Sequence, residues 1–353
     1  MPSSRSIVPS SAKRMATPEG KTQRELITNS ALLRADQVNF VLVDDSIAGQ
    51  RIDNFLCKIC KGVPKSHLYR IVRNGEVRVN KGRISVDYKL AHGDLLRIPP
   101  MRVAQVNQGG KESAPAADFP VLYEDEALLV INKPAGVAVH GGSGVSFGVI
   151  EQLRAARPEA KFLELVHRLD RETSGVLLVA KKRAALVALH RQIREGQMDK
   201  RYIALVKGRW TNPRQAVKQP LHKYTLPDGE RRVRVQADGL PSHTIFTLQA
   251  RYQHSQVGPC SLLEAQLLTG RTHQIRVHLQ HLGFPIVGDD KYGDYSLNKV
   301  LQRADAMPSL KRMFLHAVQL SLPHPISGEP LILQAPLAPT CDTFLQHLTK
   351  ESA

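Results

Sequence analysis

Hydrophobic residues recur along the chain with two periods, and the change of period marks the first predicted elements. One helix face follows the spacing i, i+3, i+4, i+7 and consists of Ile52, Phe55, Leu56 and Ile59. A second, short helix is predicted to begin at an N-cap, Ser66, and to end at Gly75. On this helix the basic residues Arg70 and Arg73 lie opposite the apolar positions. Residues 77–80 then alternate apolar and polar side chains, which indicates a strand.

From about residue 118 onward, the pattern predicts strands alternating with helices. The predicted elements are the strand pair 121–134 with its turn at 124–126, the helix 183–193 ending near Gly196, the strands 201–208 and 260–270, and the helix 271–283. No internal repeat is visible. This part of the chain is therefore expected to form one large domain that contains both strands and helices.

Composition divides the chain into four segments. Residues 1–38 are rich in Ser, Pro, Thr, Lys and Arg, and they predict a disordered basic tail. Residues 39–102 predict a compact module with one basic face, and residues 103–117 are polar and Gly/Ala-rich, as in a linker. The large domain is expected at 118–345.

The charge of the chain narrows the class of partner. It has 353 residues, with 49 Lys and Arg against 32 Asp and Glu, a formal net charge of +17. This excess indicates a polyanionic partner, with a basic solvated surface as the alternative, and charge alone does not separate DNA, RNA and acidic lipid. The sequence contains no apolar run long enough for a membrane span and no secretory signal, and its four cysteines do not form a disulfide framework. These features predict a cytoplasmic protein.

The cysteines, histidines and glycines of the chain form no metal or cofactor motif. Cys57 and Cys60 form a CxxC pair, but Cys260 and Cys341 stand alone, so core packing is favoured over zinc or redox chemistry. The histidines at 273, 278 and 281 lack a nearby carboxylate or water-activating Glu, so they are interpreted as RNA-facing or structural. The Gly-Gly-Ser-Gly stretch at 141–144 is not followed by the Gly-Lys-Ser/Thr of a P-loop. We therefore expect neither a metal nor a cofactor.

One stretch of the large domain combines charge with a predicted strand. Residues 163–170 alternate, so a strand here would place Arg168 and Asp170 on one face, roughly 6.7 Å apart. Residues 173–175 predict a turn before the apolar run 176–180. A carboxylate on a loop held by two core strands is well placed for catalysis, and it is equally suited to a structural ion pair that closes the turn. Spacing alone leaves both interpretations open.

Five segments of the large domain occur in the order typical of one enzyme family. They are NKPAG at 132–136 followed by Val139 and His140, HRLDRETSG at 167–175, KRYIA at 200–204, LTGRTHQIRVH at 268–278, and GDDKYG at 288–293. On these segments, over about residues 120–340, the chain resembles the RluA family of pseudouridine synthases. Within that family, the HGGSGVSFGVIEQLR segment is most similar to members that modify large-subunit ribosomal RNA.

The basic module is similar to the S4 RNA-binding domain. The matching segments are Arg51-Ile52-Asp53 and the run GEVRVN at 75–80. The sequence departs from the S4 pattern at 65–67, where Lys-Ser-His replaces the usual Ser-Arg pair. An S4 domain ahead of the catalytic domain agrees with the same group of ribosomal RNA enzymes.

The two resemblances imply an α+β fold in which an S4 domain precedes a catalytic domain built on a mixed, largely antiparallel sheet flanked by helices and loops. They imply that Asp170 is the nucleophile, Tyr202 packs against the uracil ring, and Arg271 is the partner of Asp170. A guanidinium beside the carboxylate would favour its ionised form and fix its orientation. Arg168 would fill the gap in the stack that a flipped-out uridine leaves. The other implied RNA-binding residues are Arg51, Lys65, Arg70, Arg73, His140 and His273.

The implied activity is isomerisation of uridines in large-subunit (23S) ribosomal RNA to pseudouridine. The sequence leaves open whether the carboxylate attacks C1′, adds to C6 or assists a glycal route, and it leaves Tyr202 open as an ordinary core tyrosine. We expect a monomer that binds ribosomal RNA before or during subunit assembly, and does not bind DNA or a membrane. Two alternatives are a non-catalytic RNA-binding or ribosome-assembly factor and a glycoside hydrolase, which would need a second site carboxylate.

Overall fold

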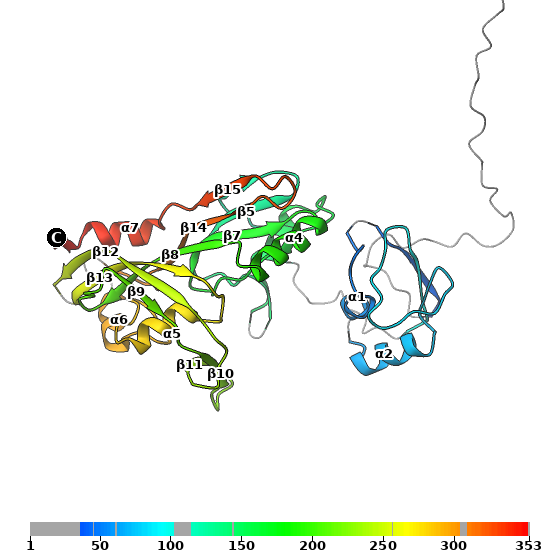
Figure 1. Ribbon diagram of the computed structural model, residues 1–353, viewed down its shortest axis with the longest axis horizontal. Coiled ribbons are helices and arrows are strands. Elements are labelled where there is room, and N and C mark those ends of the chain that lie inside the picture. Colours follow the sequence, from blue (N-terminus) through cyan, green and yellow to red (C-terminus); the bar gives the residue numbers. More distant parts are fainter. Residues whose placement is uncertain are drawn as a thin grey trace, which may run out of the picture. The chain divides into compact units, whose positions relative to one another are not determined.

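Two compact units, residues 1–106 and 107–353, make up the computed structural model (Figure 1). The structure describes residues 36–44, 46–60, 62–101, 114–142, 145–255, 257–303 and 309–351. The division between the units falls in the predicted linker, most of which, at 103–113, lies outside the described residues. Residues 1–35 of the predicted basic tail also lie outside them.

The first unit contains a three-stranded antiparallel sheet and two helices that share one apolar core. Its elements are β1 Asn39–Leu42, α1 Ile52–Ile59, α2 Lys65–Arg73, β2 Arg78–Val79 and β3 Leu95–Ile98, and the strand order is β1-β3-β2. The helix predicted at 52–59 is confirmed, and all four of its predicted apolar side chains are buried. The alternation predicted at 77–80 is also confirmed, because residues 77 and 79 are buried and residues 78 and 80 are exposed.

Helix α2 presents the predicted basic face. Leu68, Ile71 and Val72 are buried, whereas Arg70 and Arg73 are exposed. The helix ends before Gly75 as predicted, but the predicted N-cap at Ser66 is wrong. The N-cap is Pro64, whose ring holds φ at −58°, so the helix begins at Lys65.

Arg51 and the CxxC pair take structural positions in this unit. Arg51 donates to both carboxylate oxygens of Asp53, at 3.1 and 2.8 Å, directly before α1. The hydroxyl of Tyr69 on α2 donates to the same carboxylate at 3.1 Å, so this cluster joins the two helices. Cys60 is buried in the core and Cys57 is exposed, so only Cys60 fits the core-packing interpretation.

The second unit is built on one large sheet. Its elements are β4 Val121–Glu124, β5 Leu128–Lys133, α3 Val149–Ala156, β6 Glu164–Leu165, β7 Ser174–Ala180, α4 Arg183–Arg194, β8 Asp199–Lys207, β9 Arg214–Val217, β10 Leu221–Thr225, β11 Arg231–Val235, β12 Thr244–His254, β13 Gly258–Leu267, α5 Gln274–His281, α6 Tyr295–Leu301, β14 Leu315–Pro323, β15 Pro330–Gln334, α7 Pro339–Gln346 and β16 Thr349–Lys350. The strands of this sheet run in the order β16-β12-β13-β8-β14-β7-β5-β4, with β15 on β14, β6 on β7 and β9 on β12, and β10 and β11 form a separate antiparallel pair.

The pairing confirms the predicted fold class. Among the strand pairs of the described residues only β7 and β14 run parallel, so the sheet is mixed and largely antiparallel, and the chain is α+β. The predicted strand pair 121–134, the helix at 183–193 and the strands at 201–208 and 260–270 are all present. Within the described ranges, no helix is long and apolar enough to cross a bilayer.

Strand β7 is an interior strand, between β14 and β5, and all of its residues are buried. Leu177 and Val179 belong to the apolar cluster that includes α3 and α5, while Val176 and Leu178 belong to the cluster that includes α4. Figure 1 shows α4 lying along β7. A strand that is covered on both faces carries apolar side chains at every position, which is why residues 176–180 are all apolar.

Gly175 allows β7 and β14 to approach each other. It lies opposite Ala317 in the parallel pair. Its φ is +110°, and a Cβ at this position would lie 2.2 Å from the carbonyl oxygen of Ala317. Only glycine fits both conditions. This close contact places the loop before β7, with Asp170, next to the middle of the sheet.

Candidate active site

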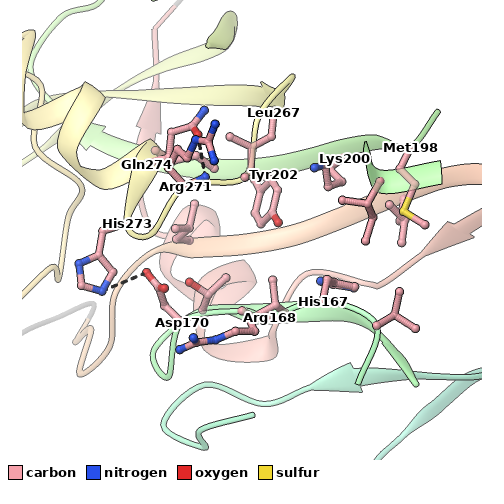
Figure 2. A pocket seen from close by; sticks show the side chains of 18 of the residues that line it. His167, Arg168, Asp170, Met198, Lys200, Tyr202, Leu267, Arg271, His273 and Gln274 are labelled. Carbon is pink, nitrogen blue, oxygen red and sulfur yellow. Dashed lines mark hydrogen bonds and ion pairs between the residues drawn. The ribbon is translucent and has the colours of Figure 1, made fainter. Parts of the chain in front are cut away.

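A cavity of about 430 Å³ opens where the loop before β7 meets β8 and the start of α5 (Figure 2). Its lining brings together five residues predicted for the site, and these are Arg168, Asp170, Tyr202, Arg271 and His273. Among the described residues that line it, Asp170 is the single acid. The same lining carries five Lys or Arg side chains, so the cavity suits an anionic ligand and holds one carboxylate among cations.

The chain before Asp170 leaves the sheet earlier than predicted. We expected a strand over 163–170, but only β6, Glu164–Leu165, pairs with β7. The physical reason is His167, whose Nε2 accepts the backbone N–H of Leu178 at 3.2 Å and so replaces a strand partner. Burial lowers the pKa of His167 to about 4, so its ring is neutral and able to accept. Asp170 therefore lies on a loop, and its side chain is 26% exposed.

Hydrogen bonds from the NKPAG segment, residues 132–136, hold the loop that carries Asp170. The carbonyl oxygen of Arg171 accepts from the backbone N–H of Gly136 at 2.9 Å and from Nζ of Lys133 at 3.0 Å. Arg171 Nε returns a bond to the Gly136 carbonyl at 2.9 Å. The Lys133 side chain is fully buried, and it also donates to the carbonyls of Pro134 and Val137. The residue after Asp170 is thus held on both sides, which gives Arg171 the positioning role that the sequence did not assign.

The ion-pair partner of Asp170 is Arg276, so the predicted pairing with Arg271 is wrong. Nη1 of Arg276 donates to Oδ2 of Asp170 at 3.1 Å. Arg271 instead donates from Nε to the carbonyl of Pro241 at 3.1 Å. The reason lies in where the helix starts. Helix α5 begins at Gln274, so Arg271 lies in the preceding turn, whereas Arg276 projects from the first helical turn toward the loop.

Arg276 is held by a second carboxylate. Its Nε and Nη2 donate to both oxygens of Asp289, each at 2.7 Å, and its side chain is 5% exposed. Burial opposes ionisation of Asp289, but the bonds from Arg276 and from the backbone N–H of Lys291 and Tyr292 leave its pKa lowered. Despite burial, the two carboxylates raise the pKa of Arg276. The GDDKYG segment therefore fixes the arginine that faces Asp170.

His273 reaches the other side of the carboxylate. Its Nε2 lies 3.9 Å from Oδ2 of Asp170, as the dashed line in Figure 2 marks. Its Nδ1 is 2.8 Å from the hydroxyl of Tyr292, and that oxygen accepts the backbone N–H of Val233 at 2.9 Å. The hydroxyl is therefore free to donate to Nδ1, which leaves the proton of neutral His273 on Nε2, toward Asp170. Burial lowers the pKa of His273 and so favours this neutral form.

Tyr202 occupies the middle of the cavity. It lies on β8 opposite Ala265 and Ala317, and its side chain points into the space beside Asp170 (Figure 2). It is 8% exposed and belongs to the main core cluster, so it is a core residue and a cavity residue at once. Burial, and then the charge of Asp170, raise the pKa of its hydroxyl, which is neutral. Because the ring lines the cavity, it can contact a planar ligand there.

The other predicted RNA-binding residues lie outside this cavity or at its mouth. Arg168 lines the cavity and is exposed. His140 is exposed beyond the lining residues, with Nδ1 2.7 Å from the carbonyl of Gly141. The remaining four belong to the first unit, and they are Arg51, Lys65, Arg70 and Arg73.

Comparisons with known proteins agree with this geometry. Residues 127–281 match the family model described as RNA pseudouridylate synthase, and residues 50–96 match the S4 domain. The chain is 53% identical over 315 residues to ribosomal large subunit pseudouridine synthase C of Yersinia pestis, covering 88% of this chain and 94% of that protein. It is 54% identical over 316 residues to the Escherichia coli K12 protein of the same name, covering 88% and 97%.

Two solved human structures share the fold of the second unit. Human RNA pseudouridylate synthase domain containing 1 aligns with a TM-score of 0.54 and 26% identity, covering 70% of this chain and 92% of that one. Human RNA pseudouridylate synthase domain containing 4 aligns with a TM-score of 0.52 and 27% identity, covering 66% and 94%.

Proposed function

The chain belongs to the RNA pseudouridylate synthase family, and we propose that it isomerises specific uridines of large-subunit (23S) ribosomal RNA to pseudouridine. The observation that carries this proposal is the carboxylate of Asp170, the single acid among the described lining residues, which is paired with Arg276 in a cavity that also holds four other Lys or Arg side chains. Relatives of about 50% identity are named ribosomal large subunit pseudouridine synthase C, and this supports large-subunit ribosomal RNA as the substrate.

In the proposed reaction the N1–C1′ bond breaks and a C5–C1′ bond forms. N1 gains a proton and C5 loses one, so the product is an isomer and no cofactor is consumed. Asp170 acts as the nucleophile, and Arg276 keeps it oriented and stabilises its ionised form. Tyr202 packs against the uracil while it is detached from the ribose, which prevents the base from leaving.

The target uridine must leave the RNA stack to reach Asp170. Arg168 lies at the exposed mouth of the cavity, next to the loop that carries Asp170. We propose that its guanidinium fills the place of the flipped base, where it stacks on the neighbouring bases. Arg271 and His140 are proposed to contact the RNA backbone, Arg271 at the edge of the cavity and His140 on the adjacent turn.

We also propose that the protein acts as a monomer in the cytoplasm, before or during assembly of the large subunit. A uridine packed inside an assembled subunit costs more free energy to flip out into the cavity, so the unassembled RNA is the better substrate. A non-catalytic RNA-binding role on the same fold is the second candidate. The intact set of Asp170, Tyr202 and Arg276 argues against it, since binding alone does not require an oriented carboxylate.

The direct test maps pseudouridines in 23S ribosomal RNA from cells with and without the protein. Carbodiimide modification followed by primer extension should show stops that disappear when the gene is deleted and return when the wild-type chain is supplied. An Asp170→Asn chain should not restore them. An unchanged pseudouridine map in the deletion strain would contradict the proposed substrate.

Removing residues 1–102 is expected to weaken RNA binding more than it slows the chemistry. The exposed side chains of Lys65, Arg70 and Arg73 are then absent, so fewer counterions are released on binding. The plot of log affinity against log salt should therefore become less steep, while single-turnover rates at saturating RNA stay within a few-fold. The matched control is the full chain with Arg70→Gln and Arg73→Gln, which should show a smaller change in the same direction. An unchanged salt slope in the truncated protein would contradict this division of labour.

A further inference from the structure

The cavity continues beyond Tyr202 into a part that the proposed chemistry does not use. Figure 2 shows Lys200, His167 and Met198 on the opposite side of Tyr202 from His273. Helix α4 adds Ile193 and Arg194 to this end of the lining. The described lining residues at this end include no acid.

Lys200 enters this part of the cavity from the sheet. It lies two residues before Tyr202 on β8, so the two side chains share a face at about 6.7 Å along the strand. The residues opposite it on both neighbouring strands are leucines, Leu267 on β13 and Leu320 on β14. Its aliphatic stem therefore packs between apolar side chains. Its Nζ comes within 3.7 Å of the Cβ position at Gly270, beside the turn that carries Arg271.

The ammonium group of Lys200 has no counter-ion in the described part of the chain. The neighbouring carboxylate, Asp199, points to the opposite face, where it accepts from Arg201 at 2.8 Å and from Gln266 at 2.8 Å. Glu264 is also bound to Arg201, at 2.8 Å. Burial accordingly lowers the pKa of Lys200. The side chain is half-buried, so holding it against apolar side chains without a counter-ion lowers the stability of the free protein, and a bound anion would offset this cost.

The unpaired ammonium group of Lys200 needs a negatively charged ligand, and this requirement identifies the ligand. A uracil carbonyl is neutral and supplies no countercharge, whereas a phosphodiester carries a full negative charge and accepts strongly from an ammonium. A further cation of the lining, Arg194 at the end of α4, favours the same ligand. His167 supplies no positive charge for this anion, because burial and the nearby charge of Lys200 lower its pKa and keep its ring neutral.

Building on the proposed function, we propose that Lys200 binds the phosphate next to the target uridine, on the side of Tyr202 away from His273. One strand then presents both contacts to the nucleotide, with Tyr202 against the base and Lys200 on the backbone. The contact between Lys200 and the phosphate holds the nucleotide at Asp170, and it persists while the base is detached from the ribose. Lys200 is a binding and positioning residue, and it takes no part in bond making.

The test measures RNA binding in the Asp170→Asn background, so that chemistry does not enter. The probe is a short RNA centred on a uridine that the wild-type protein converts, together with versions in which one flanking phosphate at a time is a neutral methylphosphonate. Lys200→Gln should weaken binding of the unmodified RNA by about 10- to 100-fold and reduce the salt slope by about 0.7 to 0.9. One methylphosphonate should weaken binding to the same extent with Lys200 present and have no further effect on Lys200→Gln.

The matched control is Lys350→Gln, which removes the same charge from an exposed position on β16 at the edge of the sheet. It should leave binding within about twofold. Equal methylphosphonate effects with and without Lys200, or a Lys200→Gln affinity equal to that of the control, would overturn the proposal. Failure of the wild-type chain to release tritium from uridine-5-³H RNA would instead overturn the proposed function, so the two failures are distinguishable.

A second variant separates binding from folding. Lys200→Met keeps the aliphatic stem between Leu267 and Leu320 and removes the unpaired charge. Its thermal midpoint should equal or exceed that of the wild type, while RNA binding falls as for Lys200→Gln. A lower midpoint for Lys200→Met would show that the ammonium supports the fold, which contradicts the proposal.

Discussion

Replacing Asp170 with Asn is expected to lower tritium release from uridine-5-³H RNA by at least about 1000-fold, because the amide cannot act as a nucleophile. The fold should survive the change. The turn after Asp170 uses its backbone carbonyl, which accepts the N–H of Thr173 at 3.1 Å, and the Asn oxygen can still accept from Arg276. RNA affinity should therefore stay within about threefold of the wild type, as measured by filter binding.

Glu172 provides the control on the same loop. It pairs with Arg171 at 3.5 Å, is 41% exposed, and does not line the cavity. Glu172→Gln removes one negative charge two residues from Asp170 and should leave the rate of tritium release within about threefold. If Asp170→Asn releases tritium at close to the wild-type rate, Asp170 is not the nucleophile and the proposed mechanism is wrong.

The regular elements of both units could be predicted from the sequence because their apolar spacing is local. The face formed by Ile52, Phe55, Leu56 and Ile59 is a core face whatever lies elsewhere in the chain. The run 176–180 is buried on both sides, and such a run predicts a central strand even without its partners. Helix starts were less certain, since Pro64 rather than a polar side chain begins α2.

The end of β6 depends on a contact that the local sequence does not reveal. Residues 163–170 alternate as a strand should, so the pattern predicts pairing up to Asp170. The pairing stops because the His167 ring binds the N–H of Leu178, which a backbone carbonyl would otherwise accept. A side chain that replaces a strand partner is a tertiary event, and alternation cannot show it.

The choice between the two arginines of the LTGRTHQIRVH segment also depended on the structure. The sequence contained one signal that favoured Arg276. It stands between Ile275 and Val277 in the predicted helix 271–283, so burial is expected there, and a buried guanidinium needs a buried acid. Asp289, in the GDDKYG segment, is such an acid. Reading these segments together, rather than one at a time, would have identified the pair.

Positioning residues were the hardest to predict. Lys133 and Arg171 belong to segments 38 residues apart in the sequence, and only the folded chain brings Nζ of Lys133 to the Arg171 carbonyl. Neither side chain lines the cavity. The motifs therefore identified the residues that line the cavity, but they did not show that Lys133 and Arg171 hold the loop in place.

Replacing Arg276 with Met is expected to cost about 3 to 5 kcal/mol of unfolding free energy, because it leaves the carboxylate of Asp289 buried without a countercharge. Tritium release should fall by at least about 100-fold, since Asp170 loses its bound donor. Arg271→Met should lower the unfolding free energy by no more than about 0.5 kcal/mol, because its guanidinium is bonded only to the carbonyl of Pro241 among the described residues. Denaturant unfolding and single-turnover kinetics measure the two effects.

The double variant Arg276→Met, Asp289→Asn separates stability from catalysis. The Asn side chain removes the buried charge and its oxygen can still accept the backbone N–H of Tyr292, so most of the lost unfolding free energy should return. Activity should not return, because Asp170 still lacks its guanidinium. A double variant that recovers both stability and activity would show that Arg276 acts only through the fold. If Arg271→Met lost as much activity as Arg276→Met while keeping its stability, Arg276 would not be the only guanidinium on which the chemistry of Asp170 depends, and its assigned role would be wrong.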